Sequence, residues 1–185
     1  MIGTRVLDKY LVVEGFRNIK IDNIDRVLKL IRMKAENCQV QVVDTALVAG
    51  FEHVYFSVLN ALKSFKSGVN ISKSLAVEVM LFISGQDQIR RAIEILGVKP
   101  SSSSVAVILI ADSREEAISA LDRISSILGG DRDQGVIELT EEKIPIIMNA
   151  FAISNLEIEA AMRNSLKNAL KSILIERGAL LVTQR

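Results

Sequence analysis

Residues 74–100 read SLAVEVMLFISGQDQIRRAIEILGVKP, and this stretch decides how the middle of the chain folds. Residues 75–83 are apolar apart from Glu78, and a helix of this composition must be buried on most of its sides. Polar residues 84–87 follow directly, and a second helix is predicted to begin there and to end before Gly97. The stretch therefore predicts two helices joined at a tight polar corner.

The polar corner is the first place to look for function, because the buried helix before it fixes its position. The polar groups of Ser84, Gln86 and Gln88 would stand there at defined places. The sequence contains no glycine-rich phosphate loop ending in Lys-Ser/Thr, no paired-histidine zinc motif and no Gly-x-Ser-x-Gly elbow. It therefore favours a binding surface over a catalytic centre.

The composition is that of a globular protein. The 185 residues suffice for one domain with its own core, and 49% of them are apolar. The net charge of +1 argues against a protein that coats nucleic acid through bulk charge. A single cysteine, Cys38, excludes an internal disulfide, and we find no signal peptide and no apolar run of about 20 residues. We therefore expect a cytoplasmic protein without membrane contact.

Interleaved strand and helix patterns predict an α+β fold. Strands are expected at Lys9–Glu14 (bounded by Gly15), Val40–Val48, Ser104–Ala111, Val136–Leu139 and, as an edge strand, Ala179–Val182. Helices are expected at Asn23–Glu36, Phe51–Lys66, Ser113–Leu128, Thr140–Phe151 and Ser154–Gly178. The continuous apolar run 104–111 should be a central strand. We expect one domain over residues 1–185, a small mixed, mostly antiparallel sheet covered by helices.

Several side chains with catalytic potential have plainer explanations. Cys38 is expected to be a buried thiol, and His53 a polar surface or capping group. Glu78 is expected to cap a neighbouring helix end or to pair with a Lys or Arg, although a raised-pKa acid is the alternative. An acidic run that starts at Asp131 has Val136 where a calcium loop needs glycine, so no metal site is predicted.

Two surfaces have charge or apolar patterns suited to a partner. No acidic residue occurs between His53 and Val77, and a local positive patch would form if the corner gathered the basic residues Lys63, Lys66, Lys73, Arg90 and Arg91. Ordinary solvated lysines are the alternative. The expected final helix has a wide apolar face that includes Met162, Leu166 and Leu170, which can dock on the protein's own sheet or on a partner.

Residues 74–100 resemble one family, the PRPK-binding (TPRKB-like) small subunit of the KEOPS complex, also called EKC. In that family an apolar helix with an internal Glu leads into Ser-Gly-x-x-Gln-Ile, then Ala-Ile and a Gly. The matching residues here are Glu78, Ser84, Gly85, Gln88, Ile89, Ala92, Ile93 and Gly97. The resemblance covers most of the chain and is loose before Val40 and after Ala150.

The resemblance implies a non-enzymatic subunit without a cofactor. KEOPS makes N6-threonylcarbamoyladenosine at position 37 of tRNA, with a Kae-type subunit performing the transfer beside a small atypical kinase. A member of this family would bind that kinase directly, meet the Kae-type subunit only within the complex, and hold the tRNA 3′ CCA end. A single-stranded end needs few phosphate contacts, which is compatible with the near-neutral charge.

We assign these implied roles to specific residues. The predicted tRNA contacts are Lys63, Lys66, Lys73, Ser84, Gln86, Gln88, Arg90 and Arg91, and the predicted kinase contacts are Met162, Leu166 and Leu170. Ile89, Ala92 and Ile93 are expected to hold the second helix in place. Two alternatives are a small-molecule-binding regulatory α+β domain and a hydrolase that uses Glu78 or Asp112.

Overall fold

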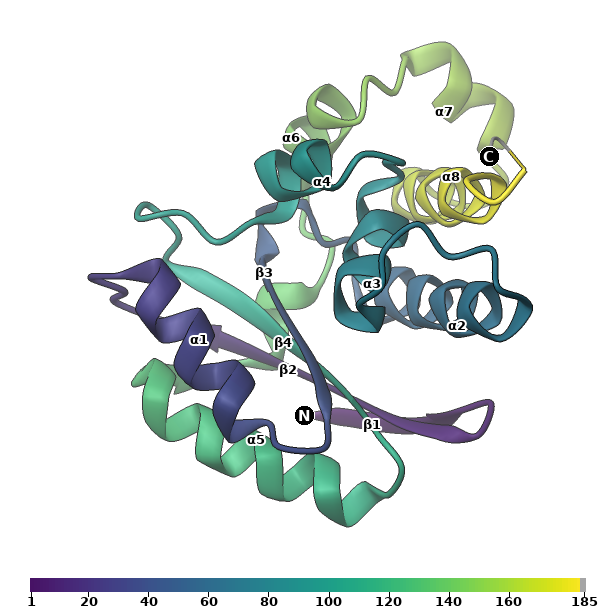
Figure 1. The fold of residues 1–185 in the computed structure, drawn as a ribbon. Helices are drawn as coiled ribbons and strands as arrows, with labels where there is room; N and C mark the ends of the chain where they lie inside the picture. Colours follow the sequence, from purple (N-terminus) through teal and green to yellow (C-terminus); the bar gives the residue numbers. More distant parts are fainter. Residues whose placement is uncertain (184–185) are drawn as a thin grey trace. The chain divides into compact units, whose positions relative to one another are not determined.

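Strand β4 (Ser104–Ala111) lies at the centre of the sheet, as its continuous apolar sequence predicts (Figure 1). In this computed structural model, which describes residues 1–183, β4 is flanked by β2 (Lys9–Arg17) and β3 (Gln39–Asp44). β1 (Ile2–Val6) continues the sheet beyond β2. Each strand pair in the described part of the chain is antiparallel, so the predicted α+β class with a mostly antiparallel sheet is confirmed.

β2 continues past the glycine that was expected to end it. Gly15 lies inside the strand. Glycine is required there because the backbone carbonyl of Asp133 approaches so closely that a Cβ would have no room. The two-residue strand β5 (Asp131–Arg132) pairs with this end of β2. The strand expected at 136–139 is absent: residues Gln134–Ile137 form a short 3-10 helix.

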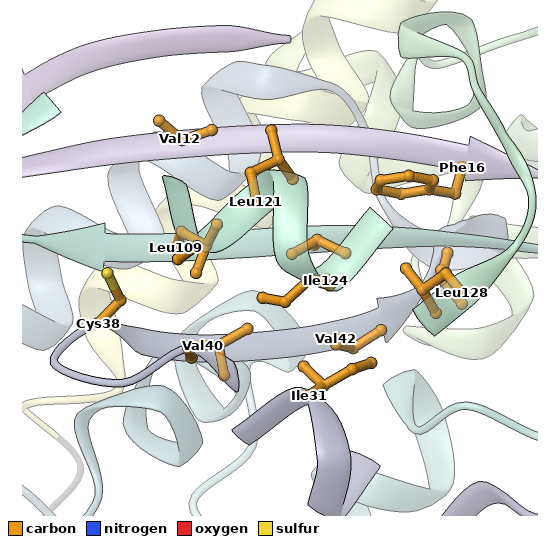
Figure 2. Close-up of a cluster of buried hydrophobic side chains, with 14 of the residues drawn as sticks. Val12, Phe16, Ile31, Cys38, Val40, Val42, Leu109, Leu121, Ile124 and Leu128 are labelled. Atoms are coloured by element: carbon orange, nitrogen blue, oxygen red, sulfur yellow. The ribbon is translucent and has the colours of Figure 1, made fainter. Parts of the chain in front are cut away.

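Helices α1 (Ile24–Lys34) and α5 (Arg114–Leu128) cover one face of the sheet. Figure 2 shows the core between these helices and the sheet. Its labelled residues are Val12, Phe16, Ile31, Cys38, Val40, Val42, Leu109, Leu121, Ile124 and Leu128. Cys38 is buried, as expected. Ser113 caps α5 in the predicted box with Glu116.

The chain forms two compact units, each made of two segments. The first unit, residues 1–45 and 97–137, contains the sheet, and the second, residues 46–96 and 138–185, is helical in its described part. The single domain predicted for residues 1–185 stays a prediction.

The second unit is built on three helices that contact one another: α2 (Phe51–Ser67), α3 (Leu75–Ser84) and α8 (Leu166–Leu180). The prediction that α3 is buried is confirmed, because its side chains from Glu78 to Ser84 are all buried. Gly68 ends α2 in the left-handed conformation, as expected, and Gly85 ends α3 in the same way.

Shorter helices complete this unit: α4 (Ile89–Leu96), α6 (Lys143–Ala150) and α7 (Asn155–Ala161). The single helix predicted from Ser154 onward is therefore wrong, since Met162 is extended and Ser165 begins α8 as a new N-cap. The edge strand expected at 179–182 is also wrong, because α8 continues to Leu180. Within residues 1–183 no single helix is long and apolar enough to cross a membrane; α6 and α7 reach that length only together and bend by 109°.

Candidate nucleic-acid interface

α2 and α3 run antiparallel, and a buried histidine joins them at one end. His53, near the start of α2, donates from Nε2 to the backbone oxygen of Ile83, near the end of α3, over 3.0 Å. Its Nδ1 accepts from the backbone N–H of Ala49 at 3.3 Å. Full burial lowers the pKa of His53 to about 4, so the ring is neutral at pH 7. The surface position expected for His53 is therefore wrong, whereas the bond from the Ala49 N–H, just before α2 begins, agrees with the capping alternative.

The corner after α3 has a polar surface smaller than the sequence predicts. Ser84 is fully buried, and its hydroxyl donates to the carbonyl of Leu81 at 3.0 Å within its own helix. A hydroxyl in this position cannot reach a ligand, so Ser84 is removed from the candidate contacts. Gln86 is half-buried and donates to the Ser84 carbonyl at 3.4 Å, whereas Gln88 is exposed. The second helix begins at Ile89, after the corner rather than within it.

The first turns of α4 present both charge and apolar surface. Arg90 and Arg91 are exposed, and Arg90 pairs with Glu94 at 3.2 Å on the surface. Ile89 and Ile93 are 39% and 51% exposed, so the expectation that they hold the helix in place is wrong. Ala92 is fully buried and, with Leu96, supplies that packing.

A second basic group surrounds the loop between α2 and α3, residues 68–74. Lys63, Lys66 and Lys73 are all exposed, and no carboxylate among residues 1–183 lies within ion-pair distance of them. Val69 and Ile71 of the same loop are also exposed. These two apolar side chains are not among the predicted contacts, although their position between lysines in a polar loop was a readable signal.

The two basic groups do not form one cluster. The antiparallel helix pair places the loop 68–74 at the start of α3 and the corner 85–88 at its end. Ten helical residues separate them, a rise of about 15 Å. A ligand that meets both groups must therefore extend along the helix pair, as a single strand of nucleic acid does.

Glu78 binds the backbone of the loop. Its Oε2 accepts from the N–H groups of Ser72 and Ile71 at 2.8 and 3.1 Å, and Oε1 accepts from Ile71 at 3.2 Å and from the Ser64 hydroxyl at 3.4 Å. The carboxyl group is fully buried. Binding the backbone of a loop is a different role from the two that were expected, capping a helix end and pairing with a basic side chain.

The predicted kinase contacts divide between surface and core. Met162 and Leu166 are 47% and 36% exposed at the junction of α7 and α8. Leu170 is fully buried in the cluster that also contains Ile147 and Ile173, so it cannot meet a partner and is removed from the candidate contacts.

A groove of about 660 Å³ lies beside this junction, within the helical unit. Its lining is mixed in character and includes Phe56, Arg163, Asn164, Asn168 and Ile175. The groove is the feature relevant to the small-molecule alternative.

The two carboxylates named for the hydrolase alternative both have partners. Asp112 is exposed and paired with Lys9, and Glu78 accepts hydrogen bonds from the loop amides.

Comparison with known proteins places the chain among kinase-binding proteins. Residues 16–180 match the family described as kinase binding protein CGI-121. The regulatory protein Cgi121 of Methanocaldococcus jannaschii is 29% identical over 143 residues, 77% of this chain and 85% of that protein. The KEOPS complex subunit Cgi121 of Pyrococcus abyssi is 28% identical over 123 residues, 66% of this chain and 64% of that protein.

Proposed function

Because the chain belongs to the CGI-121 family of kinase-binding proteins, we propose that it is a non-catalytic subunit of a KEOPS complex. The family identification made from residues 74–100 is confirmed, and the match over residues 16–180 carries the proposal. In this role the protein binds the complex's small kinase directly and meets the Kae-type subunit only through the complex. It thereby supports formation of N6-threonylcarbamoyladenosine at position 37 of tRNA in the cytoplasm.

Reconstitution tests this role. A KEOPS complex assembled with and without the chain is assayed for threonylcarbamoylation of a tRNA transcript, and co-purification reports binding to the kinase. We expect the chain to co-purify with the kinase and to raise the yield of modified tRNA. If the kinase does not bind the chain at micromolar concentrations of both proteins, the proposed function is wrong.

For tRNA, we propose that the exposed basic groups at the two ends of α3 guide the single-stranded 3′ CCA end along the helix pair. Lys63, Lys66 and Lys73 act at the loop end, and Gln86, Gln88, Arg90 and Arg91 act at the corner. The protein is nearly neutral, so only a few phosphates can be contacted, each adding about 0.7 to the log–log salt slope of binding.

A gel-shift titration tests the tRNA contact. Full-length tRNA is compared with the same transcript lacking CCA, at two salt concentrations. We expect tighter binding of the full-length transcript and a salt slope of only a few units. Equal affinity for both transcripts would remove the 3′ end as the target while leaving the kinase proposal intact.

A second candidate function is small-molecule binding by a regulatory α+β domain, favoured by the 660 Å³ groove beside the α7–α8 junction. A thermal-shift screen with nucleotides and amino acids tests it. A rise in melting temperature that disappears in the Asn164→Ala/Asn168→Ala variant would support this function, and no shift with any ligand would exclude these ligand classes.

A further inference from the structure

We propose that Glu78 is a positioning residue that holds the loop 68–74 in the shape in which Lys73, on the loop, and Lys66, on the adjoining last turn of α2, meet RNA phosphates. The inference rests on the proposed tRNA function, and it names the side chain that orders the basic group around the loop 68–74. Glu78 itself is fully buried and touches no ligand.

The contacts of Glu78 are directed to the loop backbone. The two amide groups that it binds, those of Ile71 and Ser72, lie in the middle of the loop, and the Ser64 hydroxyl on α2 contacts the same carboxyl group. Buried backbone N–H groups require acceptors, and a carboxylate that accepts several of them makes stronger bonds than a neutral oxygen. One side chain on α3 thus connects the end of α2, the loop and the start of α3.

The loop adds hydrogen bonds of its own. The Asn70 amide donates to the carbonyl of Ser72 at 3.0 Å, and the N–H of Ser74 donates to the buried Ser72 hydroxyl at 3.1 Å. The N–H of Val69 donates to the carbonyl of Ser64 at 3.0 Å. With these bonds on its inner side, the loop exposes Val69, Ile71 and Lys73, and Lys66 is exposed on the adjoining last turn of α2.

A preformed loop increases affinity because ordering does not have to occur on binding. Ordering a long side chain on binding costs conformational entropy, and a disordered loop adds the entropy of its backbone. Holding Lys73 of the loop in register with Lys66 of α2 therefore raises RNA affinity without any contact between Glu78 and RNA.

Glu78→Gln tests this role with little change in volume. The substitution replaces one acceptor oxygen with an NH₂ group, which places a donor against the loop N–H groups. It also raises the formal net charge from +1 to +2, which by itself would strengthen binding to RNA. Weaker binding by this variant therefore cannot come from charge. Glu159→Gln, at an exposed position on α7, is the matched control for the charge change.

The experiment is a double-mutant cycle on the full chain, with fluorescence anisotropy of a full-length tRNA. The four proteins are the wild type, Glu78→Gln, Lys66→Ala/Lys73→Ala and the combined variant, each checked for folding by circular dichroism. We expect Glu78→Gln to weaken binding about fivefold to tenfold and to lower the salt slope. In the Lys66→Ala/Lys73→Ala background it should have no further effect on binding, although it still lowers the melting temperature. Additive losses would overturn the inference.

The outcomes separate this inference from the proposed function. If the lysine variant binds tRNA like the wild type, the loop takes no part in binding and the proposed tRNA contact at this end fails with it. If the lysine variant binds weakly and folded Glu78→Gln binds normally, only the inference about Glu78 fails. Should Glu78→Gln not fold, Glu78→Asp takes its place in the same cycle, because the shorter side chain keeps the charge and withdraws the carboxylate from the loop N–H groups. Normal binding by folded Glu78→Asp would then refute the inference.

Discussion

The backbone oxygen of Phe82 lies 2.9 Å from the point where a Cβ on Gly178 would stand. The last turn of α3 therefore packs directly on the backbone of α8. Two residues after Phe82, the buried Ser84 ends α3, and the left-handed Gly85 follows as its C-cap, so this contact supports the corner that carries Gln86 and Gln88. Only glycine allows the two helices to come this close.

Gly178→Ala is expected to destabilise the protein by about 1–3 kcal/mol, because the new methyl group meets a backbone carbonyl that cannot rotate away. At an unhindered position in a helix the same substitution stabilises by about 1 kcal/mol, so the sign is diagnostic. Urea unfolding of the variant and of Ser172→Ala, an exposed control on α8, measures the effect. A more stable Gly178→Ala protein would show that α3 and α8 are less tightly packed than described.

His53 makes stability fall in mild acid. Its pKa is lowered by burial from 6.5 to about 4, so below pH 6.5 the unfolded chain binds a proton that the folded chain does not. The contribution of neutral His53 to the free energy of unfolding is complete above pH 6.5. It is lost as the pH falls from 6.5 to 4, by roughly 3 kcal/mol in all. Urea unfolding from pH 7.5 to 4 measures it. His53→Gln, which keeps a donor for Ile83, should lack this component of the pH dependence; an identical profile in both proteins would contradict the assignment.

Local signals predicted the helix boundaries that depend on neighbouring residues. The capping boxes at Ser113 and Ser154 were readable because Ser and Glu stand three residues apart, and each partner is local. The end of α2 was readable from Gly68 for the same reason. The break between α7 and α8 was missed, since the apolar spacing continues through it. Its cap, Ser165, lacks an acidic residue three positions later.

Signals that depend on distant contacts could not be read. Gly15 appeared to end a strand, but it is required by the carbonyl of Asp133, far away in the sequence. The burial of His53 depends on the carbonyl of Ile83 thirty residues later. At the candidate site the sequence identified the basic residues and the corner. It could not show that an antiparallel helix pair separates them, because helix orientation is a tertiary property.

Glu157 is expected to support the C-terminal helices above pH 5 and to lose this role in strong acid. Hydrogen bonds from Ser154, together with Arg177 at 2.6 Å, lower the pKa of Glu157 to about 2. A lowered carboxyl pKa gives stability that is complete above about 4.5 and is lost as the pH falls toward 2. Glu157→Gln should therefore be less stable than the wild type at pH 7 and equal to it near pH 2. Thermal unfolding across this range measures the difference, and a constant gap at every pH would contradict the assignment.

Leu166 and Leu170 should separate kinase binding from stability. Leu166 is on the surface, so Leu166→Asp should leave the melting temperature nearly unchanged and reduce co-purification with the kinase at least tenfold. Leu170 fills the core, so Leu170→Ala should cost about 2–5 kcal/mol of unfolding free energy. Met33→Asp, at an exposed position on α1, is the control for added surface charge. Normal kinase binding by folded Leu166→Asp would move the proposed interface away from the α7–α8 junction.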